Sequence, residues 1–334
     1  MKKILFLMTL TIGIFYFISN SFSAYDCEFQ MADMNWPSAT LMANVDKFIL
    51  EEGYDCKIEL VPGATTATFI TMNEKGKPHV APELWTNAIA GLLHKALEEG
   101  RLFSAIKGPI TELGEGWWIT PHTLKNYPEF KTVLDILERP DLFPAKEDKS
   151  KGAFIGCPAG WGCQLANQSL FIAFEMEKKG WMLVDPGSQA GLDGSMSKAA
   201  ERGDNWFGYY WSPTSLIGKY DMKLMDFGVP FAGSKNWDDC IAKGPELCIE
   251  PKPSAWTESI VQTVVTSEIK EMTEVMNYFG KRIFPGSIMN SMLVYMEENQ
   301  SQGADGAIEF LEKYPEIWIN WITLEAAKKI KKAL

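Results

Sequence analysis

Short apolar segments that alternate with amphipathic ones are the feature of this chain that most restricts its fold. Between residues 29 and 100, strand-like runs recur three times, and each is followed by a segment with helical periodicity. Such alternation is typical of α/β domains, in which the connecting helices cover a largely parallel sheet. The expected strands are 29–34, 56–61 and 80–85, and the expected helices are 38–52, 66–75 and 86–100.

The rest of the chain predicts a second lobe inserted into the first. Prolines and a charged stretch interrupt residues 121–152, and the Gly- and Pro-rich residues 227–253 break regular structure again. Strands are expected at 153–156, 182–184, 206–211, 223–226 and 260–265, with one helix at 164–179. Further helices are expected at 268–281, 287–297, 305–313 and 316–333. Because these last helices have no strands of their own, we expect them to pack on the first lobe.

This organisation predicts an α/β protein of two lobes with a ligand cleft between them. Lobe 1 is expected to comprise residues 24–117 and 264–334, and the inserted lobe 2 residues 118–263. Two crossings between the lobes would make a hinge. Ligands of open α/β sheets bind beyond the carboxyl ends of the strands, so the loops that follow the strands are expected to line the cleft.

The N-terminus has the pattern of a secretory signal. Two lysines precede an apolar run over residues 4–18, and small residues lead to Ala24. The run is shorter than the ~20 residues that span a bilayer, although an uncleaved anchor is the alternative. We expect residues 1–23 to be removed as a signal peptide and the remainder to be periplasmic.

Six cysteines follow the signal and fit an oxidising compartment. Six cysteines allow 15 connectivities, and sequence alone does not select one. The short loops between them favour a bond of Cys157 with Cys163 and one of Cys240 with Cys248. Cys27 and Cys56 then remain as the third pair. A metal site is the competing interpretation, but the chain lacks paired C-x-x-C spacing and has only three histidines, so no metal is expected.

Charge and tryptophan content narrow the class of ligand. The chain has 43 acidic and 32 basic side chains, which argues against a nucleic-acid partner. It also has 12 tryptophans, an excess that indicates either bulky cores or a binding surface of flat aromatic faces. Four of them follow or end expected strands, two in each lobe: Trp36, Trp85, Trp161 and Trp211. We expect these four to project into the cleft, the alternative being that each one closes the top of its sheet.

A box of indole faces suits a quaternary ammonium or a sulfonium ion. Such a cation has no N–H to donate, so the π faces hold it instead, at ~0.5–2 kcal/mol for each contact. The loop Gly160–Cys163 leads directly into a helix, and the backbone N–H groups of Gly162 and Cys163 could receive a carboxylate. An ordinary helix start beside a disulfide is the alternative.

Two acidic residues lie near these tryptophans. Glu83 shares a strand face with Trp85, and Glu115 lies where the chain is expected to cross between lobes; either would favour a cation or an N-oxide in the cleft, unless it is simply solvated. We interpret the other tryptophans as packing residues: Trp117 and Trp118 at the hinge, Trp318 and Trp321 in the last helix, and Trp181, Trp206, Trp237 and Trp256 elsewhere.

Four segments resemble the substrate-binding proteins of osmoprotectant ABC importers, the glycine betaine, proline betaine and choline group: Asp33–Trp36, Pro82–Thr86, Gly156–Cys163 and Tyr209–Pro213. The resemblance implies a type II periplasmic binding protein without catalytic activity. Trp85, Trp161 and Trp211 match the betaine-type cage, and the backbone of Gly162 and Cys163 matches its carboxylate site. Trp36 resembles an aromatic residue of choline-type relatives.

Two positions depart from that pattern. Ser38 stands where choline-type relatives have an Asp, and Glu83 stands where betaine-type relatives have an apolar or small residue. Relatives that bind trimethylamine N-oxide use an acidic residue beside a tryptophan cage, so that ligand stays open.

We therefore expect a monomeric, cofactor-free solute-binding protein that delivers a methylated osmolyte to a membrane permease and its ATPase. Glycine betaine is the first candidate ligand, with trimethylamine N-oxide, dimethylsulfoniopropionate and choline as alternatives. The competing interpretations are a secreted carbohydrate-active hydrolase with Glu83 and Glu115 as an acid/base pair, or a sugar-binding protein with stacking tryptophans. The chain lacks a G-x-S-x-G motif and has only three histidines, which argues against an enzyme.

Overall fold

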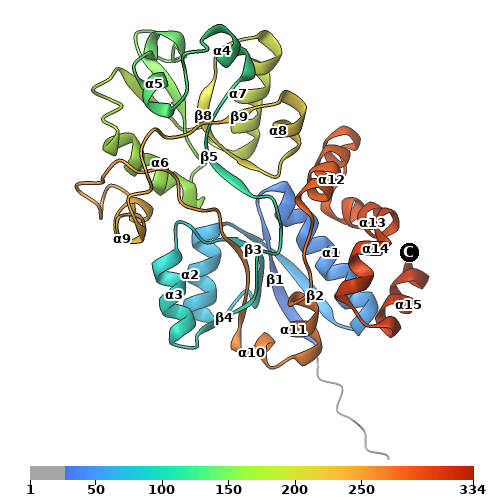
Figure 1. The fold of residues 1–334 in the computed structure, drawn as a ribbon. Helices are drawn as coiled ribbons and strands as arrows, with labels where there is room; N and C mark the ends of the chain where they lie inside the picture. The colour runs from blue at the N-terminus through green and yellow to red at the C-terminus, as the bar shows by residue number, and fades with distance from the viewer. Residues whose placement is uncertain (1–26) are drawn as a thin grey trace, which may run out of the picture.

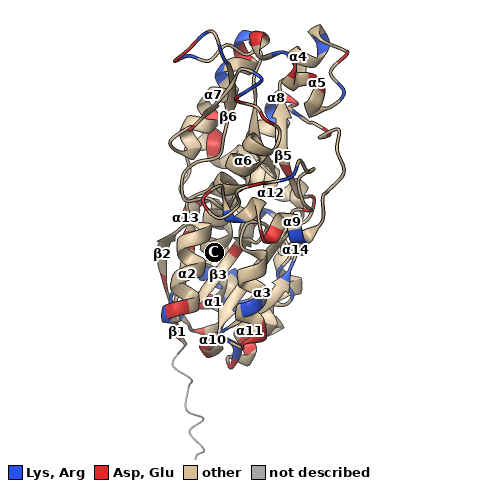
Figure 2. Cartoon of the chain, turned by 90° about the vertical axis from the view of Figure 1, so that its left-hand side faces the viewer, with Lys and Arg blue, Asp and Glu red and all other residues tan. Residues whose placement is uncertain are grey.

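The computed structural model describes residues 27–334, which form two five-stranded sheets with helices packed around each (Figure 1). The predicted signal segment lies outside the described residues. No helix within residues 27–334 is both long and apolar enough to cross a membrane. Basic and acidic residues are both scattered over the two lobes in the view of Figure 2, so this side of the molecule is not uniformly basic.

The first sheet has the strand order β2-β1-β3-β10-β4. Its strands are β1 (Glu28–Met34), β2 (Lys57–Gly63), β3 (Val80–Trp85), β4 (Leu102–Lys107) and β10 (Val261–Thr266). β1 runs parallel to β2 and β3, but β10 runs antiparallel to β3 and β4. Four of the five strands therefore run in one direction, which agrees with the expectation of a largely parallel sheet, and β10 is the exception because it returns from the other lobe in the opposite direction. The strand β4 was not predicted.

Helices cover both faces of the first sheet. The early helices are α1 (Pro37–Tyr54), α2 (Thr65–Lys75) and α3 (Ala90–Glu98). The C-terminal helices are α10 (Ser267–Lys270), α11 (Thr273–Phe279), α12 (Gly286–Asn299), α13 (Gly303–Lys313), α14 (Pro315–Trp318) and α15 (Leu324–Ala333). α13 and α15 pack on α1, and Trp318 and Trp321 are buried in the core that they share.

Two predicted C-terminal helices are each divided in the structure. The predicted helix 268–281 is α10 and α11. The predicted helix 316–333 is α14 and α15, which are separated by a 3₁₀ turn at Ile319–Trp321. α15 starts anew because Thr323 caps it: the hydroxyl of Thr323 accepts a hydrogen bond from the backbone N–H of Ala326 at 3.2 Å.

The second sheet has the strand order β7-β6-β8-β5-β9. Its strands are β5 (Gly114–Ile119), β6 (Gly152–Ile155), β7 (Trp181–Val184), β8 (Phe207–Ser212) and β9 (Lys223–Leu224). β6 is parallel to β7 and β8, whereas β5 is antiparallel to β8 and β9. The chain thus passes from the first sheet to the second between β4 and β5 and returns between β9 and β10.

The helices of the second lobe are short, apart from two. They are α4 (Pro121–Asn126), α5 (Val133–Leu137), α6 (Gly162–Ala173), α7 (Gln189–Arg202), α8 (Ser215–Tyr220) and α9 (Ser234–Asp238), with 3₁₀ turns at Pro140–Leu142 and Ile241–Lys243. The expectation that residues 121–152 lack regular structure is wrong for α4 and α5. A proline in the first turn suits the start of α4, and a capping box of Thr132 and Asp135 starts α5.

Three disulfides stabilise the described chain, and they confirm the three expected pairings. Cys27 is bonded to Cys56 beside β1 and β2, and Cys240 is bonded to Cys248 in the irregular stretch after α9. Cys157 is bonded to Cys163 and closes the loop between β6 and α6. This third bridge fixes the position of Trp161, which lies within the loop.

Candidate functional site

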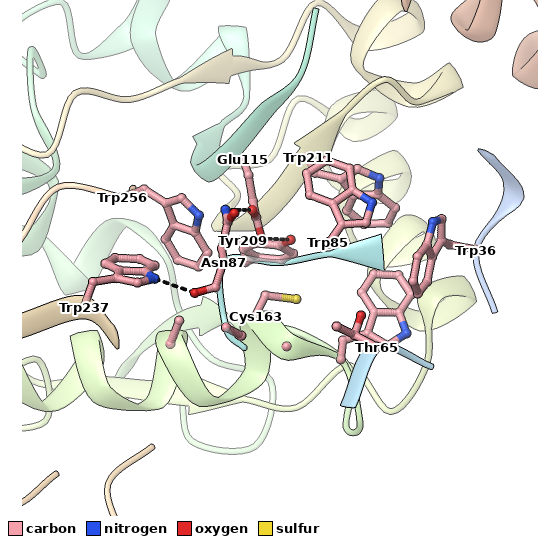
Figure 3. Close-up of a pocket in the computed structure, with 14 residues that line it drawn as sticks. Trp36, Thr65, Trp85, Asn87, Glu115, Cys163, Tyr209, Trp211, Trp237 and Trp256 are labelled. Carbon is pink, nitrogen blue, oxygen red and sulfur yellow. Dashed lines mark hydrogen bonds between the residues drawn. The ribbon is translucent and has the colours of Figure 1, made fainter. Parts of the chain in front are cut away.

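A pocket lies between the two sheets and is lined by residues of both lobes (Figure 3). Seven of its side chains are aromatic, and none of its described lining residues is Lys, Arg or His. The lining residues are Trp36, Thr65, Trp85, Asn87, Ala88, Glu115, Trp161, Gly162, Cys163, Ala166, Tyr209, Trp211, Trp237 and Trp256.

The four tryptophans that were expected to meet in the cleft all line this pocket. Trp161 packs edge-on against two of the others: its ring centroid lies 5.5 Å from that of Trp36 and 5.0 Å from that of Trp211, with interplanar angles of 72° and 78°. The indole Nε1 of Trp161 also donates a hydrogen bond to Asn35 Oδ1 at 2.9 Å, which joins the second lobe to the loop after β1. Rings at right angles form adjacent walls of a box.

Three further aromatic residues line the other end of the pocket. Tyr209 lies 5.5 Å from Trp256, and Trp256 lies 5.2 Å from Trp237, measured between ring centroids. The default interpretation of Trp237 and Trp256 as packing residues misses their place in the pocket wall, since they lie in an irregular stretch where no strand end indicates their direction. Tyr209 could have been found, since it precedes Trp211 by two residues on the same strand face.

Glu115 places one carboxylate inside the pocket. Its Oε1 accepts a hydrogen bond from the hydroxyl of Tyr209 at 2.8 Å, and its Oε2 accepts one from Asn87 Nδ2 at 2.7 Å. Burial raises the pKa of Glu115 to about 7, and the hydrogen bonds partly oppose this shift. Both the neutral and the charged form of this group are therefore accessible near neutral pH.

Glu83 lies behind the pocket wall and is not among the lining residues. Its Oε1 accepts hydrogen bonds from the indole N–H groups of Trp36 at 2.7 Å and Trp85 at 2.8 Å. Burial also raises the pKa of Glu83 to about 7. Because only Glu115 faces the pocket, the two carboxylates do not flank a common space, as the acid/base pair of a glycosidase would.

Gly162 and Cys163 bring the start of α6 to the pocket. Trp161 is the N-cap residue and its side chain does not cap the helix, so the first N–H groups of α6 are not satisfied by the cap. A Cβ atom on Gly162 would lie 2.7 Å from the Cβ of Ala88 in the other lobe. Glycine is thus required here by the close approach of the two lobes.

Comparison with known families identifies the family that has this architecture. The family described as the substrate-binding domain of the ABC-type glycine betaine transport system matches residues 28–313. The chain belongs to this family. It is the substrate-binding component of a glycine betaine/choline-type ABC transporter, and proteins of this family bind small ligands outside the cytoplasm rather than catalyse reactions. No curated protein sequence is significantly similar to the chain.

Solved structures of binding proteins from such transporters share the fold. A glycine betaine/L-proline-binding protein from Borrelia burgdorferi is 17% identical with a TM-score of 0.70, covering 91% of this chain and 99% of its own. A choline-binding protein in complex with choline is 14% identical with a TM-score of 0.70, covering 92% and 98%. A lactococcal protein closed around glycine betaine is 16% identical with a TM-score of 0.66, covering 89% and 100%.

These comparisons confirm the resemblance noted in the sequence and the two-lobe α/β class of fold. In this glycine betaine-type binding protein, seven of the eight expected ligand residues line one pocket, and Glu83 alone lies behind it.

Proposed function

We propose that this protein captures a small methylated ammonium or sulfonium osmolyte in the aromatic pocket and delivers it to a membrane permease. The observation that carries the proposal is the composition of the pocket wall: seven aromatic rings and one buried carboxylate, without a basic side chain among the described lining residues. An onium ion offers methyl groups and a diffuse positive charge, which aromatic faces attract without hydrogen bonds.

Closure of the two lobes is the step that completes the pocket. Trp36 and Trp85 come from the first lobe, whereas Trp161 and Trp211 come from the second, so an open form exposes only half of the box. A ligand that contacts all four rings stabilises the closed form selectively and shifts the population toward it. At ~0.5–2 kcal/mol for each ring, four contacts contribute about 2–8 kcal/mol, and the upper end of that range is close to the free energy of micromolar binding, about −8.2 kcal/mol.

Glycine betaine remains the first candidate ligand. Its trimethylammonium group would occupy the indole box, and its carboxylate would meet the backbone N–H groups of Gly162 and Cys163. Both residues line the pocket at the start of α6, where unsatisfied N–H groups favour an anion.

Trimethylamine N-oxide is the second candidate, and Glu115 is the observation that favours it. The oxygen of an N-oxide accepts hydrogen bonds, and the neutral form of Glu115 can donate one from within the pocket. A carboxylate ligand, by contrast, is repelled when Glu115 is ionised.

Titration calorimetry of the purified protein tests the function itself. We expect binding on the order of micromolar or tighter for at least one of glycine betaine, trimethylamine N-oxide, dimethylsulfoniopropionate and choline, and none for a neutral disaccharide. Binding of the disaccharide without binding of any methylated onium would contradict the proposal.

The pH dependence of affinity separates the candidate ligands. A net cation such as choline favours ionised Glu115, so its affinity is expected to rise as the pH increases through about 7. An N-oxide or a betaine favours the neutral form, so its affinity is expected to fall over the same interval, by up to about tenfold for each pH unit. Calorimetry at several pH values measures the slope.

The control for this slope is Glu115→Gln, which preserves shape and removes the titration. The part of the slope that Glu115 contributes is expected to disappear in the variant, and only the smaller contribution of Glu83, whose pKa is also raised to about 7, is expected to persist. A slope that persists unchanged would assign the titration to another group and contradict a contact between Glu115 and the ligand.

A further inference from the structure

Glu83 accepts hydrogen bonds from two of the indoles that line the pocket, although its own side chain does not line it. One oxygen, Oε1, accepts three hydrogen bonds: from Trp36 Nε1 at 2.7 Å, Trp85 Nε1 at 2.8 Å and the hydroxyl of Ser38 at 2.9 Å. Trp36 follows β1, Trp85 ends β3 and Ser38 belongs to α1, so a single atom joins three elements of the first lobe.

This arrangement lowers the stability of the folded protein. The side chain of Glu83 is fully buried, and its Oε2 has no hydrogen-bond partner among the described residues. Arg282 is the cation whose charge acts on Glu83, but its guanidinium is paired with Asp46 at 3.0 Å. A buried carboxylate with one unsatisfied oxygen and no counterion of its own lowers stability relative to an apolar residue of the same size.

The loss of stability is accompanied by a stronger attraction of the pocket for cations. An indole ring is positive at its edge and negative at its face, and an anion hydrogen-bonded at the N–H edge increases the negative charge of the face. A fixed negative charge behind the wall also attracts a cation in front of it, and little water intervenes to screen the two. Both effects act on the faces of Trp36 and Trp85.

We propose that Glu83 is a positioning residue for the ligand: its Oε1 fixes the indoles of Trp36 and Trp85, and its charge strengthens their attraction for an onium ion. This inference rests on the proposed function, because it assumes a cation in the box. It assigns the selectivity for charged over neutral methylated ligands partly to a group that the ligand does not touch.

Two variants separate orientation from charge. Glu83→Gln retains an oxygen acceptor and removes the charge, whereas Glu83→Met removes both and suits a buried position. Burial raises the pKa of Glu83 to about 7, so binding is measured at about pH 8.5, where the wild-type carboxylate is ionised. Each variant is titrated with a bound quaternary ammonium, such as choline, and with its neutral carbon isostere, here 3,3-dimethylbutan-1-ol.

Glu83→Gln is expected to bind the onium about fivefold more weakly and the neutral isostere with unchanged affinity. Glu83→Met is expected to lose about 30-fold for the onium and to weaken the isostere as well, because the rings are no longer held. Ser38→Ala is the matched control: it removes one bond to the same oxygen but leaves the charge and both indole bonds, and it is expected to retain onium affinity.

Wild-type affinity for the onium in Glu83→Met would overturn the proposal, and equal losses for onium and isostere in Glu83→Gln would overturn its electrostatic part. If Glu83→Gln does not fold, as judged by its thermal transition, Glu83→Met carries the test. Failure of the proposed function itself is distinguishable, because the wild-type protein would then bind no onium ligand at all.

Discussion

Replacement of Trp161 by alanine is expected to weaken onium binding by about 100-fold or more. The change removes one cation-π face, worth ~0.5–2 kcal/mol, and the edge contact with Trp36 across the lobes, worth about 0.5–1.5 kcal/mol. It also removes the hydrogen bond to Asn35 across the lobes. These losses act on the closed, liganded form, so calorimetry on the folded variant measures them as a higher Kd.

Trp206 offers a matched control in the same lobe. Its indole is buried and donates a hydrogen bond to Ser195, but it does not line the ligand pocket. Trp206→Ala is expected to lower the melting temperature and to leave the Kd of the folded protein nearly unchanged. Similar affinity losses in both variants would show that Trp161 acts through packing rather than through ligand contact.

Gly162→Ala is expected to produce the second large loss of affinity, through obstruction of lobe closure. The added methyl group would lie 2.7 Å from the Cβ of Ala88 in the opposite lobe. Such overpacking costs about 1–3 kcal/mol, and here the penalty falls on the closed form, so the Kd should rise roughly 5- to 150-fold. The thermal stability of the ligand-free protein should change little if its open form avoids the contact.

Ala88→Gly provides the test of this mechanism. Without the Cβ of Ala88, the nearest atoms to the new methyl group are Thr65 Cγ2 at 3.6 Å and Ala88 Cα at 3.9 Å, which are ordinary contact distances. The double variant is therefore expected to regain most of the affinity. Additive losses in the double-mutant cycle would contradict the steric explanation.

The sequence predicts the aromatic box because strand ends indicate where side chains point. Trp36 follows β1 and Trp85 ends its parallel neighbour β3, so their positions at one edge of the sheet follow from the strand assignment. Trp237 and Trp256 could not be predicted, since residues 227–253 and the segment after them have no periodicity to fix a direction. Their places depend on tertiary contacts such as the hydrogen bond from Trp237 to the backbone oxygen of Asn87.

Glu83 shows where a correct local rule is incomplete. Alternation along β3 places Glu83 on the face of Trp85, and the hydrogen bond between them agrees with this. That rule does not reveal that Trp36, which follows the adjacent strand β1, also donates to Glu83, nor that Glu83 itself does not line the pocket. The direction of β10 is hidden for a similar reason: sequence pattern identifies a strand but not its orientation in the sheet.

The central claim is that aromatic faces recognise the positive charge of a methylated onium, and a comparison of matched ligands tests it most directly. Each onium has a neutral-headed isostere in which carbon replaces nitrogen: 3,3-dimethylbutyrate for glycine betaine, tert-butanol for trimethylamine N-oxide and 3,3-dimethylbutan-1-ol for choline. Calorimetry measures the ratio of the two dissociation constants for the pair whose onium binds. The account predicts that the onium binds at least about 30-fold more tightly, which corresponds to about 2 kcal/mol. Equal affinities within a pair would show that the pocket recognises only the shape and apolar surface of the ligand, and would contradict the account.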